Sequence, residues 1–212
     1  MKKRLAIGMI TVMVLSTSVA MASPVEMEEG KWNVSAGVMF NPDSSVDDGD
    51  GDIDFDSDTS FYGGVTYGIT DKWGVQLDYS HYDSSYSIAD IKMDATEFNV
   101  VYGLNPNLNL FAGYVYAGAN MKVSGTKLDE GSHTDGFQAG LSGWYPLGDK
   151  FKTFGKVGIG NNSRIYEIGF SYTFAENWNV DLSYRDAQYD DFDDAGVDGE
   201  IDGVCLGVST SF

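Results

Sequence analysis

The sequence is poor in several residue types, and each shortage excludes a class of protein. One of its 212 residues is cysteine, so neither an intrachain disulfide nor a cysteine-based zinc site can form. Basic residues number 13 against 32 acidic ones, which gives a formal net charge of −19. Phosphate binding needs basic side chains, so we expect no nucleic-acid partner. Proline is scarce while glycine, tyrosine and phenylalanine are abundant, a composition that favours strands over disorder.

Long hydrophobic runs are also missing, and the main apolar stretch lies at the N-terminus. It covers residues 5–15, follows three basic residues, and precedes the small-x-small sequence Ala20-Met-Ala22. This order is typical of a secretory signal peptide cleaved after Ala22, and the stretch is shorter than the ~20 residues of a membrane helix. Removal of residues 1–22 leaves an exported chain with a net charge of −22. Any membrane contact must then come from strands.

Alternation of apolar and polar residues dominates the rest of the chain. In Trp32–Phe40, for example, Trp32, Val34, Val38 and Phe40 alternate with smaller or more polar residues. The pattern predicts about ten strands of roughly 10 residues, a length that crosses a bilayer when the strand is tilted. The expected strands cover residues 32–40, 61–69, 73–80, 97–104, 108–116, 136–145, 151–159, 166–174, 178–185 and 203–212.

The connections between these strands alternate between short and long. Short turns are expected at 70–72, 105–107, 146–150 and 175–177, and long connections at 41–58, 83–93, 120–134 and 190–199. Asn161-Asn162 breaks the alternation and is typical of a two-residue hairpin turn. Short turns at one end and long loops at the other indicate a bacterial outer-membrane barrel. We therefore predict an all-β, antiparallel up-and-down transmembrane β-barrel at 31–212, preceded by the signal peptide (1–22) and a short periplasmic segment (23–30). Eight strands are the alternative to ten.

Two sets of residues follow from this register. Aromatic residues at the short-turn ends should form the girdle of one membrane interface. The predicted girdle is Trp32, Trp73, Tyr145, Phe151, Phe174, Trp178 and Phe212. Charged residues on the opposite face should line the lumen. The predicted lumen cluster is Asp78, Glu97, Lys152, Lys156, Glu167, Asp181 and Arg185. Counting across the turns places Glu167 opposite both Lys156 and Arg185, and buried charges of opposite sign should pair.

Acidic residues are concentrated in two segments. Residues 41–58 and residues 186–202 contain eight acids each. Asp48, Asp50, Asp52 and Asp54 alternate with glycine or isoleucine, which suggests weak binding of a divalent cation such as calcium. The EF-hand pattern itself fails, because Ile53 and Thr59 stand where it needs glycine and glutamate. The favoured interpretation is a pair of solvated acidic loops, with weak divalent binding as the alternative, and no other cofactor is expected.

Residues for catalysis are sparse. His81 and Ser84 lie close to an expected loop and to spare carboxylates, so an outer-membrane hydrolase is an alternative function. His81 however shares the outward face of its strand, and no further residue completes a triad. We therefore expect no enzymatic activity.

The whole pattern resembles that of the small outer-membrane β-barrel superfamily, which includes OmpA-type, OmpX-type and OmpW-type barrels. The resemblance rests on the signal peptide, the alternating strands, and the closing segment Val204–Phe212 with its terminal aromatic residue. The stretches Trp144–Asp149 and Trp178–Arg185 add to it. OmpA-type and OmpX-type barrels have eight strands, a departure from the ten counted here. The resemblance implies contact with outer-membrane lipid, lipopolysaccharide and the barrel-assembly machinery.

These observations lead to one expected function with an alternative. The expected protein is a monomeric outer-membrane barrel with acidic extracellular loops, a largely plugged polar lumen, and an envelope-structural or surface-interaction role. The alternative is a small porin that passes small solutes or cations.

Overall fold

The computed structural model describes residues 24, 26–47, 52–57, 60–86, 89–123, 126–127, 131–192 and 198–212. The expected signal peptide lies outside these residues. Within them the regular structure is a set of strands: β1 (Trp32–Asp47), β2 (Asp52–Ser57), β3 (Ser60–Gly68), β4 (Trp73–Tyr86), β5 (Ala89–Asn105), β6 (Leu108–Val123), β7 (Thr126–Lys127), β8 (Ser132–Pro146), β9 (Phe151–Gly160), β10 (Ser163–Ala175), β11 (Trp178–Tyr189) and β12 (Asp198–Ser211). In this part of the chain no helix has the length and apolarity to span a membrane.

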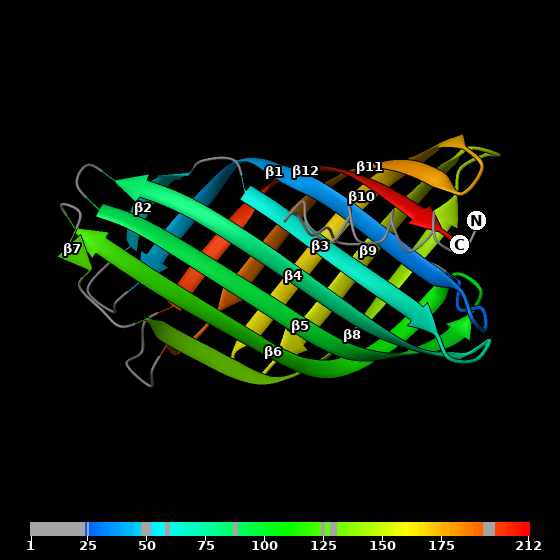
Figure 1. Ribbon diagram of the computed structural model, residues 1–212, viewed down its shortest axis with the longest axis horizontal. Coiled ribbons are helices and arrows are strands. Elements are labelled where there is room, and N and C mark those ends of the chain that lie inside the picture. Colours follow the sequence, from blue (N-terminus) through cyan, green and yellow to red (C-terminus); the bar gives the residue numbers. More distant parts are fainter. Residues whose placement is uncertain are drawn as a thin grey trace, which may run out of the picture.

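The strands close into a barrel (Figure 1). Successive strands pair antiparallel, and β1 pairs with β12, which removes both edges of the sheet. β2 and β3 pair with β1 in one continuous register, so they are two parts of one interrupted strand. β7 pairs with the end of β6 beyond β8. The described residues therefore form a closed antiparallel barrel of ten strands. The ten-strand prediction is confirmed, and the eight-strand alternative is wrong.

The predicted register is also confirmed. Short turns gather at one end of the barrel, where β12 ends, and β2 and β7 lie at the opposite end (Figure 1). We call these the short-turn end and the loop end. Lys156 lies opposite Glu167 between β9 and β10, and Glu167 lies opposite Arg185 between β10 and β11. A slip of one residue would have exchanged the inner and outer faces of a strand.

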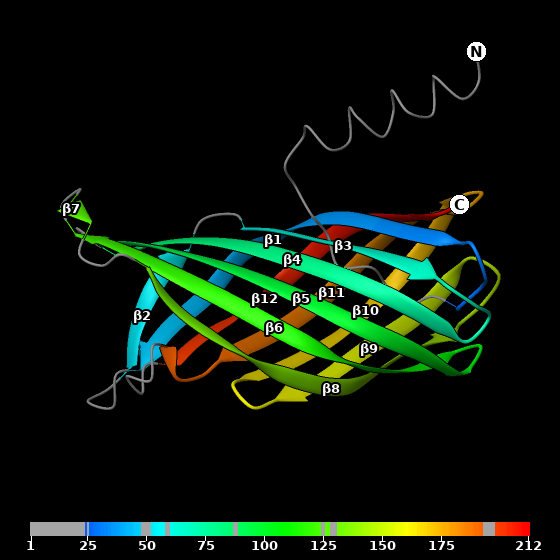
Figure 2. The same cartoon turned by 60° about the horizontal axis from the view of Figure 1, so that its bottom comes forward.

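The four long connections are shorter than the sequence predicted. Much of segment 41–58 belongs to β1 and β2, and β4 and β5 take residues 83–86 and 89–93 of the second connection. The two remaining connections likewise lose residues to β6, β7, β8 and β12. The strands thus continue beyond the apolar belt, and the extension is visible at the loop end in Figure 2. The β9–β10 hairpin extends less far toward the loop end than the β4–β6 wall does in both views.

This extension was missed because the polarity of the strands inverts along the barrel axis. In the part of β5 nearer the short-turn end, Phe98 faces outward and is 51% exposed, while Glu97 and Asn99 face inward and are buried. Nearer the loop end of the same strand, Met93 and Ala95 are buried and Lys92 is exposed. A barrel in lipid is apolar outside and polar inside, whereas a barrel in water has the reverse pattern. The inversion therefore marks where the wall leaves the membrane.

Tyrosine–aspartate hydrogen bonds stand at this boundary. The hydroxyl groups of Tyr79, Tyr114 and Tyr184 donate to Asp94, Asp135 and Asp202 respectively, each pair bridging neighbouring strands on the outer face. Tyrosine has an apolar ring and a polar hydroxyl, which suits it to a membrane interface. These pairs define the outer limit of the apolar belt.

The opposite limit is the predicted aromatic girdle. All seven girdle residues are exposed and lie at or beside the short-turn ends of their strands. Three of them pack in tilted contacts against tyrosines of neighbouring strands, with ring centroids 4.6 Å apart for Trp32–Tyr67 and 4.7 Å apart for Trp73–Tyr102 and Phe151–Tyr172. Exposed aromatic rings in this position are typical of a membrane interface.

The orientation of the barrel is testable by thiol labelling in intact cells. In a Cys205→Ala background, a cysteine replacing Glu200 at the loop end should react with a membrane-impermeant maleimide added outside. A cysteine replacing Asp149 at the short-turn end should react only after the outer membrane is permeabilised, because short turns of such barrels face the periplasm. The reverse labelling pattern would contradict the orientation.

Candidate functional site: the barrel lumen

The loop end of the lumen is filled by apolar side chains. These residues, which we call the outer core, are Met39, Tyr62, Tyr82, Met93, Ala95, Val115, Ala117, Ile165, Ala187, Tyr189, Phe192, Ile201 and Cys205. All are buried, and they come from both halves of the sheet. Phe192 lies beyond β11, where Thr134 donates to the carbonyl oxygen of Asp190 at 2.7 Å and fastens this segment to β8. The outer core thus resembles the interior of a water-soluble barrel.

Below the outer core lies a layer of charges, which we call the ion-pair layer: Asp78, Glu97, Lys156 and Arg185. Lys156 Nζ donates to Glu97 at 2.9 Å and to Asp78 at 3.2 Å. Arg185 Nη2 donates to Glu97 at 3.2 Å. The four side chains are 1–5% exposed, so the charges are shielded from solvent. Their mutual pairing is what makes such burial tolerable.

The ion-pair layer spans the lumen from wall to wall. Glu97 lies on β5 and Arg185 on β11, which stand on opposite sides of the ring of strands. Gln138 on β8 adds hydrogen bonds of 3.0 Å to Glu97 and to Asn99. A ring of eight strands is just wide enough for side chains to fill, and ten strands enclose little more. Long charged side chains from opposite walls therefore meet at the centre.

Glu167 is placed as predicted, but the pairing expected there is not the main one. It accepts a hydrogen bond from Ser183 Oγ at 2.7 Å. Its two cationic neighbours, Lys156 and Arg185, form their ion pairs with Glu97 on the other side of the lumen. Counting residues along strands cannot reveal such contacts, because they depend on the diameter of the ring.

The remaining two lumen residues lie nearer the short-turn end. Lys152 is half-buried and lies over the ring of Trp144, with Nζ 5.7 Å from the ring centroid. Asp181 is 5% exposed, and neither carboxylate oxygen has a hydrogen-bond partner among the described residues. Ser171 lies between them in the strand register. All seven predicted lumen residues thus lie on the inner wall, at two levels.

The segment before β1 enters the short-turn mouth. Met27 is 6% exposed and packs against Val101 and Phe111 inside the lumen. Gly30 N donates to the carbonyl oxygen of Gly68 at 2.8 Å, which joins this segment to β3. The sequence predicted only a short periplasmic segment at 23–30. The apolar Met27, which stands among Glu26, Glu28 and Glu29, was the available signal for the insertion.

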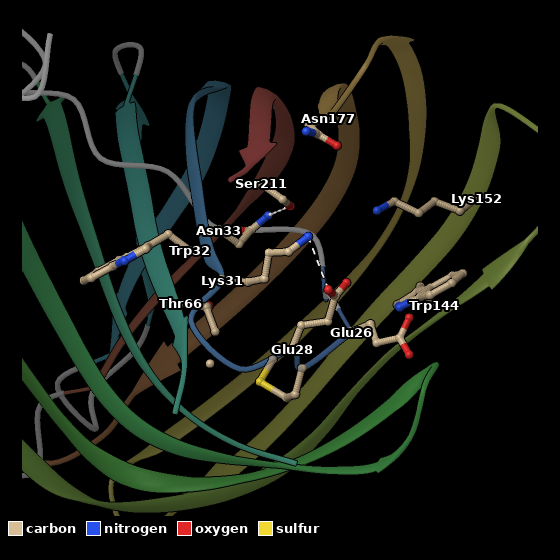
Figure 3. Close-up of a pocket in the computed structure, with 12 residues that line it drawn as sticks. Glu26, Glu28, Lys31, Trp32, Asn33, Thr66, Trp144, Lys152, Asn177 and Ser211 are labelled. Atoms are coloured by element: carbon tan, nitrogen blue, oxygen red, sulfur yellow. Dashed lines mark hydrogen bonds and ion pairs between the residues drawn. The ribbon is translucent and has the colours of Figure 1, made fainter. Parts of the chain in front are cut away.

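A pocket of about 230 Å³ remains beside this segment (Figure 3). Its lining includes Glu26, Glu28 and Lys31 of the segment and Lys152 and Trp144 of the β8–β9 wall. Glu28 and Lys31 pair at 3.2 Å within the segment. The pocket has both charges in its lining and so selects no ligand class by charge alone.

The residues suggested for calcium fall partly outside the described chain. Asp48 and Asp50 are not described, and Asp52 and Asp54 lie in β2 opposite Asp47 and Ser45 of β1. Among the described residues no group of three or more His, Cys, Asp or Glu side chains is arranged to hold a metal ion.

Register does bring acids together on neighbouring strands at the loop end. Asp186 lies opposite Asp202, Asp202 opposite Asp43, and Asp43 opposite Asp56. These four acids, which we call the acidic row, lie on the adjacent strands β11, β12, β1 and β2. Like charges placed opposite one another across strands are destabilising.

His81, the candidate base, faces outward near the boundary. Its Nδ1 lies 2.7 Å from Asp94 and its Nε2 lies 3.2 Å from Asp83. Both ring nitrogens are therefore engaged with carboxylates, and neither is placed to take a proton from a hydroxyl nucleophile. The backbone of Ser84 is in β4.

A closed antiparallel barrel with an apolar outer belt, aromatic residues at both limits and a polar interior is a transmembrane β-barrel of the outer-membrane type. Comparison with known families agrees with this class. Residues 10–212 match the family described as outer membrane protein beta-barrel domain, so the chain belongs to this family and is a protein of the bacterial outer membrane. No curated protein matches the chain.

Several solved structures are similar in fold. The outer membrane protease OmpT from Escherichia coli is 10% identical, with a TM-score of 0.57 over 86% of this chain and 97% of that one. The translocator domain of the autotransporter NalP from Neisseria meningitidis is 13% identical, with a TM-score of 0.52 over 100% and 98%. Ail, the attachment invasion locus protein of Yersinia pestis, is 17% identical, with a TM-score of 0.45 over 87% and 99%. At these identities the likeness concerns the fold alone.

Proposed function

We propose that this protein is a closed outer-membrane barrel that supports an acidic extension outside the cell and carries no solute flux. The observation that supports this most directly is the ion-pair layer, in which Arg185 and Lys156 meet Glu97 across the full width of the lumen. Water or a solute would have to separate buried charges to pass this layer. Leaving one of them unpaired costs about 3–5 kcal/mol.

The outer core is a second barrier above the first. Its tyrosines, methionines and aliphatic residues occupy the lumen where a porin would need a hydrated opening. Buried apolar side chains are an unfavourable environment for an ion, because they offer no group to replace its hydration. Two barriers of different chemistry, stacked along one axis, favour the closed barrel over the small porin.

The extension at the loop end supports the surface role. Its strands are joined by backbone pairing and contain a buried core, so it presents residues on a rigid support. The acidic row concentrates negative charge on one side of this support. Repulsion between the opposed Asp186 and Asp202 is relieved by a cation, and divalent cations that bridge to lipopolysaccharide phosphates are the partners proposed for the acidic row.

The surroundings of His81, the candidate base, do not support a catalytic function. The fold shared with OmpT does not carry an activity over to this chain, and His81 has carboxylates at both nitrogens. The proposal is therefore a structural or surface-interaction protein.

Conductance of the refolded mature protein in planar bilayers tests the closed lumen. We expect no resolved current steps at neutral pH, because both barriers stay in place. A Glu97→Gln variant should also show no steps, because the outer core stays in place, and Glu29→Gln, whose side chain is exposed on the N-terminal segment, is the matched control. Steps of tens of picosiemens or more in the unmodified protein would reject the closed barrel in favour of the porin.

Calcium provides a test of the acidic row. Millimolar calcium should slow hydrogen exchange at the loop-end parts of β1, β2, β11 and β12, because neutralising opposed carboxylates strengthens their strand pairing. The double variant Asp186→Asn/Asp202→Asn should exchange slowly without calcium and respond less to it. Exchange that is insensitive to calcium in the unmodified protein would remove the divalent cation from the proposal.

A further inference from the structure

The N-terminal segment, residues 26–31, packs against three glycines of the barrel wall, which we call the glycine seat. Gly68 on β3, Gly74 on β4 and Gly103 on β5 lie next to it on adjoining strands. A Cβ atom added at Gly68 would lie 2.0 Å from the carbonyl oxygen of Glu28, and one at Gly74 would lie 2.8 Å from Met27 Sδ. The segment approaches the wall so closely that a side chain at these positions would displace it. Glycine is the residue that permits such a close approach.

Backbone hydrogen bonds fix the segment in this seat. Gly30 N donates to Gly68 O at 2.8 Å, and Gly68 N donates to Lys31 O at 2.9 Å. Gly30 adopts a φ of +77°, which lets the chain turn from the lumen into β1. Glu29 N donates to Asp71 in the β3–β4 turn at 3.3 Å. These bonds attach the segment to one side of the mouth, at β3 and the turn that follows it.

A pocket lies beside the segment, toward the opposite side of the mouth. Lys152 and Trp144 on the β8–β9 wall line this pocket together with Glu26 and Glu28 of the segment (Figure 3). Among residues 26–31 only Met27 is buried, and it packs inside the lumen. The ring of ten strands and the ion-pair layer are built from other residues, so they do not depend on this contact.

We infer that residues 26–31 are a latch, which covers the short-turn mouth while Met27 occupies its glycine seat and exposes the lower lumen when Met27 leaves it. The inference rests on the proposed closed barrel and adds a movable periplasmic closure to it. Opening the latch gives access only as far as the ion-pair layer. The barrel therefore remains closed to ions in both positions of the latch.

Accessibility of a buried thiol tests the latch. Val101, which Met27 covers, is replaced by cysteine in a Cys205→Ala background, and the reaction with a small charged thiol reagent is followed in the refolded full-length mature protein. Replacing Met27 by aspartate should speed the reaction by about tenfold or more, because the acid does not stay in an apolar seat and the local opening becomes cheaper. Glu29→Gln, on the same segment but exposed, should leave the rate unchanged.

Two outcomes would overturn the latch. One is an equal reaction rate with methionine and aspartate at position 27. The other is a failure of the double variant Met27→Cys/Val101→Cys to form a disulfide under mild oxidation, which would show that the two residues do not meet. The double variant also serves if Met27→Asp does not refold, as judged by heat-modifiable gel migration.

Failure of the latch is distinguishable from failure of the closed barrel. If the latch is right, Met27→Asp exposes Val101→Cys while planar-bilayer recordings of the same variant still show no steps. Current in the unmodified protein contradicts the closed barrel and leaves the labelling contrast intact. Absence of the labelling contrast contradicts the latch and leaves the conductance result intact.

Discussion

Ten strands enclose a ring so narrow that charged side chains from opposite walls meet at its centre. This constraint determines the rest of the interior. Glu97, Lys156 and Arg185 are buried, and each can remain ionised only because the others lie within ion-pair distance. A wider ring would let water solvate the same residues, and a porin lumen would result. The diameter of the barrel therefore decides whether polar inward residues form a channel or a closed layer.

Polarity along the strands follows from what surrounds the barrel at each height. Between the aromatic girdle and the tyrosine–aspartate pairs, lipid covers the outside, so large apolar side chains face outward. Above the pairs water covers the outside, and Met93 and Ala95 turn the apolar face of β5 inward. The extension thus has an interior of its own. Burial of this apolar interior stabilises the strands where they continue past the membrane. The acids of β1, β2 and β12 are therefore carried on paired strands.

The sequence was sufficient for the strands of the barrel and their register, and insufficient for the contacts inside the lumen. Alternation and turn lengths predicted the strand number, the register of Glu167 and the aromatic girdle, because these depend on neighbours along or across adjacent strands. The loop-end strands were missed because alternation was followed only while it kept apolar residues outward. Asp52-Ile-Asp-Phe-Asp56 alternates as well, with an acid at every second position. The cross-lumen pairing and the seat of Met27 depend on the ring diameter and on chain packing, and no short-range pattern contains that information.

Glu97 and Arg185 interact across the lumen, and a double-mutant cycle measures this interaction most directly. Stability of Glu97→Gln, Arg185→Gln and the double variant is obtained from urea unfolding in lipid vesicles, with Asp83→Asn/Lys92→Gln as the cycle for a more exposed pair. Each lumen single variant should lose about 3–5 kcal/mol. The double variant should lose less than the sum of the two, with a coupling energy of about 1–3 kcal/mol. The exposed pair should couple by less than about 1 kcal/mol. Additive losses at Glu97 and Arg185 would contradict the account.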